Sequence, residues 1–240
     1  MVDQDAYRFE YDTPILRYGQ GCVANLSDEL EKAGLERALI VCGSTVGDAP
    51  AVIDPVTKGL GNRLAGIYDQ TSPEKRLTTA IRGANRMADE DVDVIIGLGG
   101  GSSLDIARVM SLIAARSDDP STLGQELETT GTINVPETSL TPIITIPTTL
   151  AGADLSSVAG VSATVDEGLV STDVSGGIGD RRLMPAASFH DPQLFATTPT
   201  SVLRGSAMNG FDKGVETLYT KNATPITDGT AMRGIQLLAD

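Results

Sequence analysis

The sequence contains no tryptophan, one histidine and two cysteines, and aromatic residues make up only 4% of its 240 residues. No apolar run approaches the ~20 residues of a membrane-spanning helix, so we expect no contact with a membrane. Cys22 and Cys42 have neither a metal-site spacing nor a disulfide framework, and the acidic start, Met1–Ala6, lacks the apolar segment of a signal peptide. These absences predict a cytoplasmic protein.

Positive charge is also scarce. Lysine and arginine together number 18 against 32 acidic residues, which gives a formal net charge of −14. This balance argues against nucleic acid and anionic membranes as partners, and a phosphate ligand must then be held by local backbone dipoles. Two explanations of the acidity stay open, a halophilic protein in a high-salt cytoplasm, where charges are strongly screened, or simply a soluble acidic protein.

Apolar segments of strand type alternate with segments of helical periodicity along most of the chain. This alternation predicts an α/β fold with a parallel, doubly wound sheet. We expect a nucleotide-binding α/β domain over residues 1–191, followed by the start of an all-α domain over residues 192–240. The alternation of Arg8–Tyr11 also suggests a short strand before this pattern begins.

Two stretches between these segments have less regular patterns. Residues 118–137 are polar and rich in turn-forming residues, which predicts a surface excursion. Residues 156–171 are expected to form a β-hairpin, with strands at Val158–Ser162 and Gly168–Ser171 and a turn at Asp166 and Glu167.

The most informative segment begins with a β-branched run, Val92–Ile96, which is typical of a strand buried on both faces. A glycine-rich turn follows, and Ser102 or Ser103 is expected to cap the next helix. Strand, glycine turn and helix together predict an anion site, because glycines allow close approach and the first helical N–H groups point at the ligand. The alternative is a purely structural turn, since the spacing matches neither a P-loop nor G-x-G-x-x-G. The turn contains Gly97, Gly99, Gly100 and Gly101.

A second buried strand, Ala38–Cys42, ends at Gly43 and Ser44. In dinucleotide-binding folds a carboxylate at such a place bonds the ribose 2′-hydroxyl and repels the 2′-phosphate of NADP. Glycine and a hydroxyl stand here instead, so we expect NADP(H) to be admitted and preferred. The alternative is an ordinary loop, with NAD bound without the acid.

The segment Gly99–Arg108 resembles the G-G-G-S-x-x-D-x-x-K motif of the iron-containing alcohol dehydrogenase family, with Arg108 at the family's lysine. That family has a dehydroquinate synthase-like fold with a nucleotide-binding domain and a helical domain. The resemblance implies a cofactor-binding role for the turn and the helix after it. The implied residues are Gly99, Gly100, Gly101, Ser102, Ser103 and Asp105, beside Gly43 and Ser44 of the earlier loop.

Two further motifs occur in the family's order. Pro147–Ser156 resembles P-T-T-x-A-G-S-E-x-T, the form typical of the maleylacetate reductase branch, and implies that Thr148 and Thr149 contact the cofactor. Met184–Pro192 resembles the L-P-x-x-x-x-x-D-P segment before the helical domain. His190, the only histidine, falls outside the family's ligand positions. We interpret it as structural, with an acid or base role as the alternative to test.

The family's metal helix is represented by Ala207–Tyr219, but its chemistry differs. Asn209 occupies the first ligand position of the family. Lys213 occupies the position of the family's first histidine ligand, and lysine is a protonated donor and a poor metal ligand. The family's other histidine ligands lie beyond the position of Asp240. We therefore expect no metal, and we hypothesise that Lys213 is catalytic and polarises a substrate carbonyl. The alternative is an exposed ion pair of Lys213 with Asp212 or Glu216.

Together the motifs predict an oxidoreductase that moves hydride between NADP or NAD and a small alcohol or carbonyl substrate, in a homo-oligomer. Two alternatives remain open. One is a lyase of the dehydroquinate synthase type, which uses NAD transiently. The other is a non-catalytic remnant that binds a nucleotide.

Overall fold

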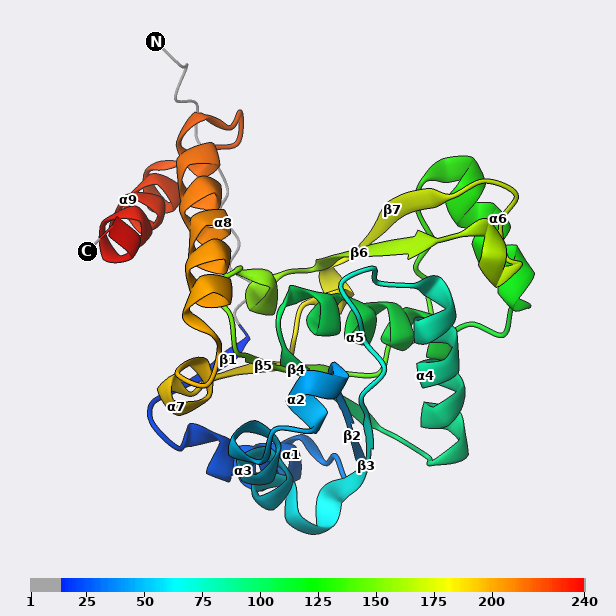
Figure 1. Cartoon of the computed structure of the whole chain (residues 1–240), viewed down its shortest axis with the longest axis horizontal. Coiled ribbons are helices and arrows are strands. Elements are labelled where there is room, and N and C mark those ends of the chain that lie inside the picture. Colours follow the sequence, from blue (N-terminus) through cyan, green and yellow to red (C-terminus); the bar gives the residue numbers. More distant parts are fainter. Residues whose placement is uncertain (1–13, 240) are drawn as a thin grey trace.

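The structure is a computed structural model, which describes residues 14–239; the strand expected at Arg8–Tyr11 lies outside these residues. Its core is a parallel sheet of six strands in the order β1-β8-β5-β4-β2-β3 (Figure 1). These strands are β1 (Ile15–Tyr18), β2 (Ala38–Val41), β3 (Leu64–Tyr68), β4 (Val94–Gly99), β5 (Ile143–Pro147) and β8 (Ala187–His190). The predicted α/β class with a parallel sheet is confirmed.

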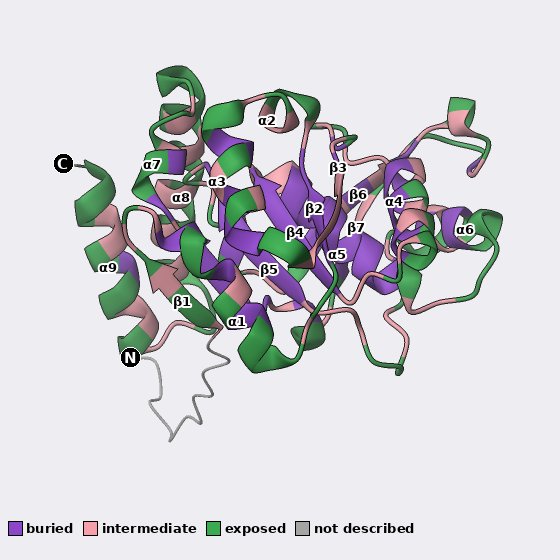
Figure 2. Ribbon diagram, turned by 90° about the horizontal axis from the view of Figure 1, so that it is seen from below, coloured by how far each residue is buried: buried purple, intermediate pink, exposed green. Residues whose placement is uncertain are grey.

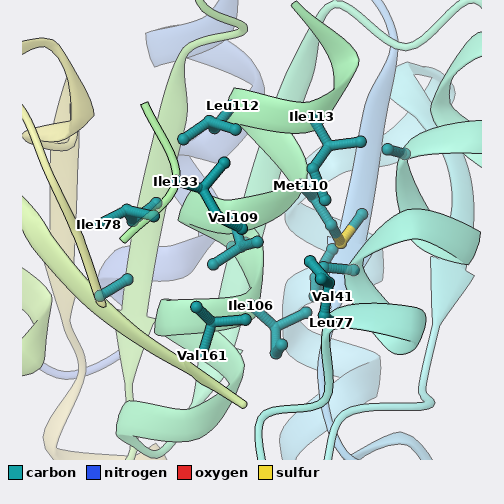
Figure 3. Packing of buried hydrophobic residues seen from close by; sticks show 14 of the residues in the cluster. Val41, Leu77, Ile106, Val109, Met110, Leu112, Ile113, Ile133, Val161 and Ile178 are labelled. Atoms are coloured by element: carbon teal, nitrogen blue, oxygen red, sulfur yellow. The ribbon is translucent and has the colours of Figure 1, made fainter. Parts of the chain in front are cut away.

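Helices cover both faces of this sheet, which makes it doubly wound. One face packs on α1 (Leu26–Ala33) and α3 (Pro50–Leu60), and the other on α4 (Leu77–Asp89) and α5 (Gly101–Ala114). Each face buries a separate apolar cluster, and the central strands are buried throughout (Figure 2). Figure 3 shows the second cluster, in which Met110 of α5 packs beside Leu77 of α4 and Val41 of β2. Residues on all sides of α5 are buried. A helix that lies between two layers of structure needs an apolar surface on all sides.

A two-stranded antiparallel ribbon extends this second layer. It consists of β6 (Val158–Ala163) and β7 (Val174–Gly179), and it packs along α5. The expectation of a second strand at Gly168–Ser171 is wrong. A capping box between Thr164 and Glu167 instead forms a short 3-10 helix, Val165–Glu167, and delays the return strand.

The polar stretch after α5 is also more regular than expected. It contains α6 (Pro120–Thr130), a helix within the expected surface excursion that the sequence analysis did not identify. Asp119 accepts a hydrogen bond from the Ser121 N–H at the helix start, and Gly131 ends the helix in the left-handed region. Leu123 and Leu127 anchor this helix against the core.

The chain ends in helices that stand apart from the sheet (Figure 1). The short α2 (Ser44–Gly47) and α7 (Pro192–Phe195) lie at the ends of strands, whereas α8 (Thr200–Tyr219) and α9 (Pro225–Ala239) pack on each other. Their close approach uses Gly214, where a Cβ would lie 2.8 Å from Ile235. The start of a helical region is thus seen, and its division from the α/β domain at residues 191 and 192 stays a prediction.

No helix within residues 14–239 has both the length and the apolar character needed to cross a membrane.

Candidate functional site

The candidate site lies where the carboxyl ends of β2, β4 and β5 meet (Figure 1). The chain runs from β2 outward to β3, and then returns to place β4 on the other side of β2. Loops after neighbouring strands therefore leave toward opposite faces of the sheet. In open α/β sheets such a switch point forms the ligand crevice, here between the turns at residues 43–44 and 99–103.

The glycine turn has the backbone that an anion site requires. Gly99 has φ of +124°, which favours glycine, and Gly100 is the extended residue before the first turn of α5. The expectation that Ser102 or Ser103 caps this helix is wrong, because Gly100 occupies the cap position and no side chain bonds there. Since the first N–H groups of any α-helix lack intrahelical partners, those of Gly101 and Ser102 are free for an anion.

The loop after β5 packs closely against the glycine turn and leaves little room for side chains there. A Cβ on Gly100 would lie 3.4 Å from the Thr149 methyl group, and one on Gly101 would lie 3.4 Å from the Ala153 Cβ. The Thr148 N–H donates to the Gly99 carbonyl oxygen at 3.0 Å, which joins the β5 loop to the turn. The residues present thus form a glycine-lined cradle with free N–H groups, and this arrangement fits the pyrophosphate of a dinucleotide.

Two predicted cofactor residues of α5 already have partners within the chain. The Ser103 hydroxyl lies 2.7 Å from the Thr71 hydroxyl, and both are buried. The Asp105 carboxylate lies 2.6 Å from the Lys75 ammonium and accepts a hydrogen bond from the Gly160 N–H. These contacts fix α5 to the β3 loop and to β6. Contacts of Ser103 and Asp105 with a cofactor stay predictions.

Arg108 supports the opposite side of the turn. Its side chain is fully buried, and its guanidinium donates to the carbonyl oxygens of Ala153 at 2.6 Å and Ser156 at 2.8 Å. Burial lowers the pKa of this guanidinium, and the Asp105 and Asp154 carboxylates oppose that shift. Arg108 therefore holds the loop after β5 in place beside the glycine turn.

At the end of β2, Gly43 is extended and starts α2, and Ser44 follows it in the predicted crevice. A Cβ on Gly43 would lie 3.1 Å from the Thr71 carbonyl oxygen, so a side chain there is sterically disfavoured. The Asp48 and Asp69 carboxylates are nevertheless close enough to Cys42, the residue before Gly43, to act on its thiol. Burial raises the pKa of the Cys42 thiol to about 12, and Asp69 and Asp48 add to that effect.

A polar cluster that the sequence did not indicate links β5, β8 and the loop between them. The Nε2 atom of His190 lies 3.1 Å from Asp154 Oδ2 and 3.0 Å from the Ser188 hydroxyl. The Thr145 hydroxyl donates to the Asp154 carbonyl oxygen at 3.1 Å and lies 2.9 Å from the Ser188 hydroxyl, from which it accepts. Residues 145, 188 and 190 share one face through strand pairing, which periodicity alone does not reveal.

The helix that corresponds to the family's metal helix does not fit a metal. The Asn209 amide donates to the Ala151 carbonyl oxygen at 2.9 Å, and Lys213 lies 2.5 Å from Glu216 with a 61% exposed side chain. The Glu216 carboxylate raises the pKa of the Lys213 ammonium, which keeps it protonated and unable to act as a ligand. Within residues 14–239, no three His, Cys, Asp or Glu side chains are grouped to hold a metal ion.

A doubly wound sheet with a glycine turn at its switch point is the architecture of the dinucleotide-binding class of α/β folds. A family model for iron-containing alcohol dehydrogenases matches residues 13–192, and the chain belongs to that family. The family resemblance of the three motifs is thereby confirmed.

Known relatives are longer. A maleylacetate reductase of Pseudomonas knackmussii is 28% identical over 229 residues, which are 94% of this chain and 54% of that protein. An NAD-dependent methanol dehydrogenase of Bacillus methanolicus is 25% identical over 92% of this chain and 55% of its own length. The chain thus spans about half the length of these relatives.

Solved structures show the same fold. A 1,3-propanediol oxidoreductase matches with a TM-score of 0.83 at 23% identity, over 97% of this chain and 58% of its own. A sulfoacetaldehyde reductase from Bifidobacterium kashiwanohense, solved with NAD+, matches with a TM-score of 0.84 at 20% identity, over 97% and 59%.

Proposed function

We propose that this chain binds NADP or NAD at the glycine turn and forms the dinucleotide half of an oxidoreductase. The supporting observation is the cradle itself, in which the N–H groups of Gly101 and Ser102 stay free at the start of α5. Gly99, Gly100, Thr148 and Thr149 would line the pyrophosphate. The bound dinucleotide would supply hydride chemistry, and this chain's residues would hold and orient it.

The proposed reaction is the interconversion of a small alcohol and its carbonyl compound. It rests on the family and on the relatives, whose names include maleylacetate reductase and methanol dehydrogenase. Since the chain spans about half of these proteins, its own turnover is part of the proposal.

We further propose that NADP is preferred over NAD. Gly43 presents no carboxylate toward the crevice, and its closeness to the Thr71 backbone resists any side chain there. The nearby Asp48 and Asp69 act in the other direction, because their charges disfavour a 2′-phosphate. A direct comparison of the two dinucleotides decides between these effects.

The reaction would proceed without the family metal. The Asn209 amide is engaged with a carbonyl oxygen and Lys213 is cationic, so no step is assigned to a metal ion here. We keep Lys213 as the proposed group that polarises the substrate carbonyl, although it now pairs with Glu216. The Asn209 amide of α8 donates to the Ala151 carbonyl oxygen of the β5 loop, and this contact supports a role for α8 in the proposed reaction.

The decisive experiment is a titration with NADP+ and NAD+, each with and without added Zn2+ or Fe2+. We expect binding that does not depend on the metal ions. The variant Gly101→Asp places a carboxylate at the cradle and should weaken binding about tenfold or more. Gly229→Asp makes the same change on α9, at a site with open surroundings, and is the matched control. Equal affinity of both variants would contradict the proposal.

A second candidate is nucleotide binding without turnover, for which the free N–H groups at the start of α5 would suffice. Dinucleotide binding with no change in NAD(P)H absorbance in the presence of alcohols or aldehydes would select it. A lyase of the dehydroquinate synthase type would likewise show no net NAD(P)H change, but it would consume its substrate.

We also propose that the protein works in a cytoplasm of high salt, from its net charge of −14 and the scarcity of cysteine. A homo-oligomer is a separate proposal that these features do not support. Sedimentation and activity measured across a range of KCl concentrations test both points.

A further inference from the structure

His190 combines buried partners with an accessible ring. It is the last residue of β8, and its side chain is 27% exposed, whereas that of Asp154 is 10% exposed. Its Nε2 atom faces both the Asp154 carboxylate at 3.1 Å and the Ser188 hydroxyl at 3.0 Å. Among residues 14–239, no hydrogen bond to its Nδ1 atom is formed. One ring nitrogen is thus held and the other is free.

Hydrogen counting fixes which nitrogen carries the proton in the neutral ring. An ionised Asp154 only accepts, so a bare Nε2 lone pair at 3.1 Å would be repelled, whereas Nε2–H donates favourably. The Ser188 hydroxyl accepts from Nε2–H, because its own hydrogen goes to the Thr145 hydroxyl oxygen at 2.9 Å, whose hydrogen in turn goes to the Asp154 carbonyl oxygen. The neutral imidazole is therefore protonated at Nε2, with a free lone pair on Nδ1.

The carboxylate that sets this tautomer is itself rigidly placed. Asp154 lies in the short 3-10 helix Ala153–Leu155, and Thr145 donates to its carbonyl oxygen at 3.1 Å. Arg108 donates to the carbonyl oxygens on both sides of it, those of Ala153 and Ser156. A fixed carboxylate behind a histidine is the arrangement that orients an imidazole for proton transfer.

The ring also lies next to the proposed dinucleotide cradle. Thr145 of β5 pairs with Ser188 of β8, so His190 is level with Pro147, which directly precedes the two cradle threonines. Ala153, the neighbour of Asp154, packs against Gly101 of the glycine turn. The free nitrogen therefore belongs to the same edge of the sheet as the dinucleotide site.

We propose that His190 is the proton donor and acceptor of the reaction, and that Asp154 is its positioning residue. This proposal rests on the proposed hydride transfer. In reduction, a bound dihydronicotinamide would supply hydride to the carbonyl carbon, and His190 would give the Nδ1 proton of its imidazolium to the carbonyl oxygen. The alcohol, the oxidised dinucleotide and the neutral imidazole result. Oxidation of the alcohol reverses both transfers, with Nδ1 taking the hydroxyl proton.

The charged group that faces the ring is the Asp154 carboxylate at Nε2; two further charged residues, Asp191 and Arg108, are buried and belong to the segments on either side. Asp191 caps α7 through the Gln193 N–H, and Arg108 lies behind the Asp154 loop. Because reduction uses a proton on Nδ1, the rate of reduction should fall as the pH rises.

A nitrogen NMR spectrum tests the tautomer without any turnover, because the chain has a single histidine. We expect the neutral ring to be protonated at Nε2, and Asp154→Asn to remove this preference. The signal should also shift when NADP+ and 1-butanol are added together. A neutral ring protonated at Nδ1, or a ring that stays unchanged with both ligands present, would overturn the proposal.

Kinetics give the second test. His190→Ala should lower the rate of butanal reduction about 100-fold or more, with dinucleotide affinity kept and with the pH-dependent decline lost. Added imidazole should raise the rate of this variant and leave the wild type unchanged. Phe195→Leu, which alters a ring packed 6.4 Å from the imidazole, is the control for packing. A His190→Ala variant with wild-type rate and pH profile would refute the role.

These readouts separate the two proposals. A wild-type protein that does not bind the dinucleotide would refute the proposed function. Intact binding with an unaffected His190 variant sinks only the proton-transfer role. If the wild type binds dinucleotide without turnover, the tautomer and the shift with both ligands still decide the placement of the ring.

Discussion

The Lys75 ammonium lies 2.6 Å from the Asp105 carboxylate and ties the loop before α4 to the helix after the glycine turn. Lys75 adopts a positive φ of 54°, a conformation that is rare outside glycine. Its carbonyl oxygen also accepts the Ser162 N–H, so this one residue joins the loop, α5 and the β6 ribbon.

Replacing Lys75 with Met should destabilise the fold by about 1–3 kcal/mol, because Asp105 loses its closest cation in a largely buried place. The estimate is kept low since the Lys75 side chain is 32% exposed. Lys32→Met, at a 62% exposed side chain 3.8 Å from Glu29, is the control and should cost about 0.5 kcal/mol or less. Urea unfolding measures both. Equal effects would contradict the assignment of a structural ion pair.

Substitution of glycine by alanine should have opposite effects on stability at Gly59 and Gly234. A Cβ on Gly59 would lie 2.1 Å from the Val23 carbonyl oxygen, so Gly59→Ala must move backbone and should cost about 3 kcal/mol or more. A Cβ on Gly234 of α9 meets nothing within 4 Å, and Gly234→Ala should stabilise by up to about 1 kcal/mol. Thermal unfolding of the two variants checks the signs, and a stabilised Gly59→Ala would refute the close approach.

Glu128 should contribute to the stability of the fold in a way that depends on pH. Hydrogen bonds from Ser171 and Thr172 lower the pKa of its carboxyl group from 4.5 to about 2. A folded-state pKa below the unfolded value means stability that is present above about pH 4.5 and lost as pH falls toward 2. The deficit of Glu128→Gln relative to wild type should therefore shrink across this window. Acid unfolding curves measure it, and Ser171→Ala should reproduce part of the effect. A deficit that is constant with pH would argue against this linkage.

Lys213→Met tests the proposed polarising group. If the ammonium stabilises charge on the substrate oxygen, the variant should lose about 100-fold in turnover while dinucleotide affinity stays unchanged. Glu216→Gln is the matched control, because it removes the 2.5 Å ion pair and keeps the cation. Unchanged turnover of Lys213→Met would leave only the exposed ion pair as its role.

Much of the fold was predictable because its signals are local. The continuous apolar run of β4 and the helical stripe of α4 each indicate one kind of element, and their alternation implies a parallel sheet. The ribbon was predicted only in part. Its return strand, β7, contains Gly176 and Gly177, which have low strand propensity, and the capping box at Thr164 shifted its start.

The candidate site was likewise predicted only in part. The glycine turn and the two threonines of the β5 loop were identified from adjacent residues. The partner of Asp105 is Lys75, 30 positions away, and the partner of His190 is Asp154 on another loop. Such pairs depend on the register of strands and on loop paths, which no local pattern specifies. The α6 helix was missed for a different reason, since its Asp-Pro start and glycine end were outweighed by its polar composition.

The pairing of β1 with β8 joins Ile15 to Ala187, the first strand to the last of the sheet. During synthesis β1 therefore emerges without its neighbour and waits for about 170 further residues, roughly ten to thirty seconds at ordinary translation speeds. Ile15, Leu16 and Tyr18 remain largely exposed even after pairing. Until β8 has been synthesised, the apolar β1 strand therefore has no partner in the sheet and is a segment that a chaperone can protect on the ribosome.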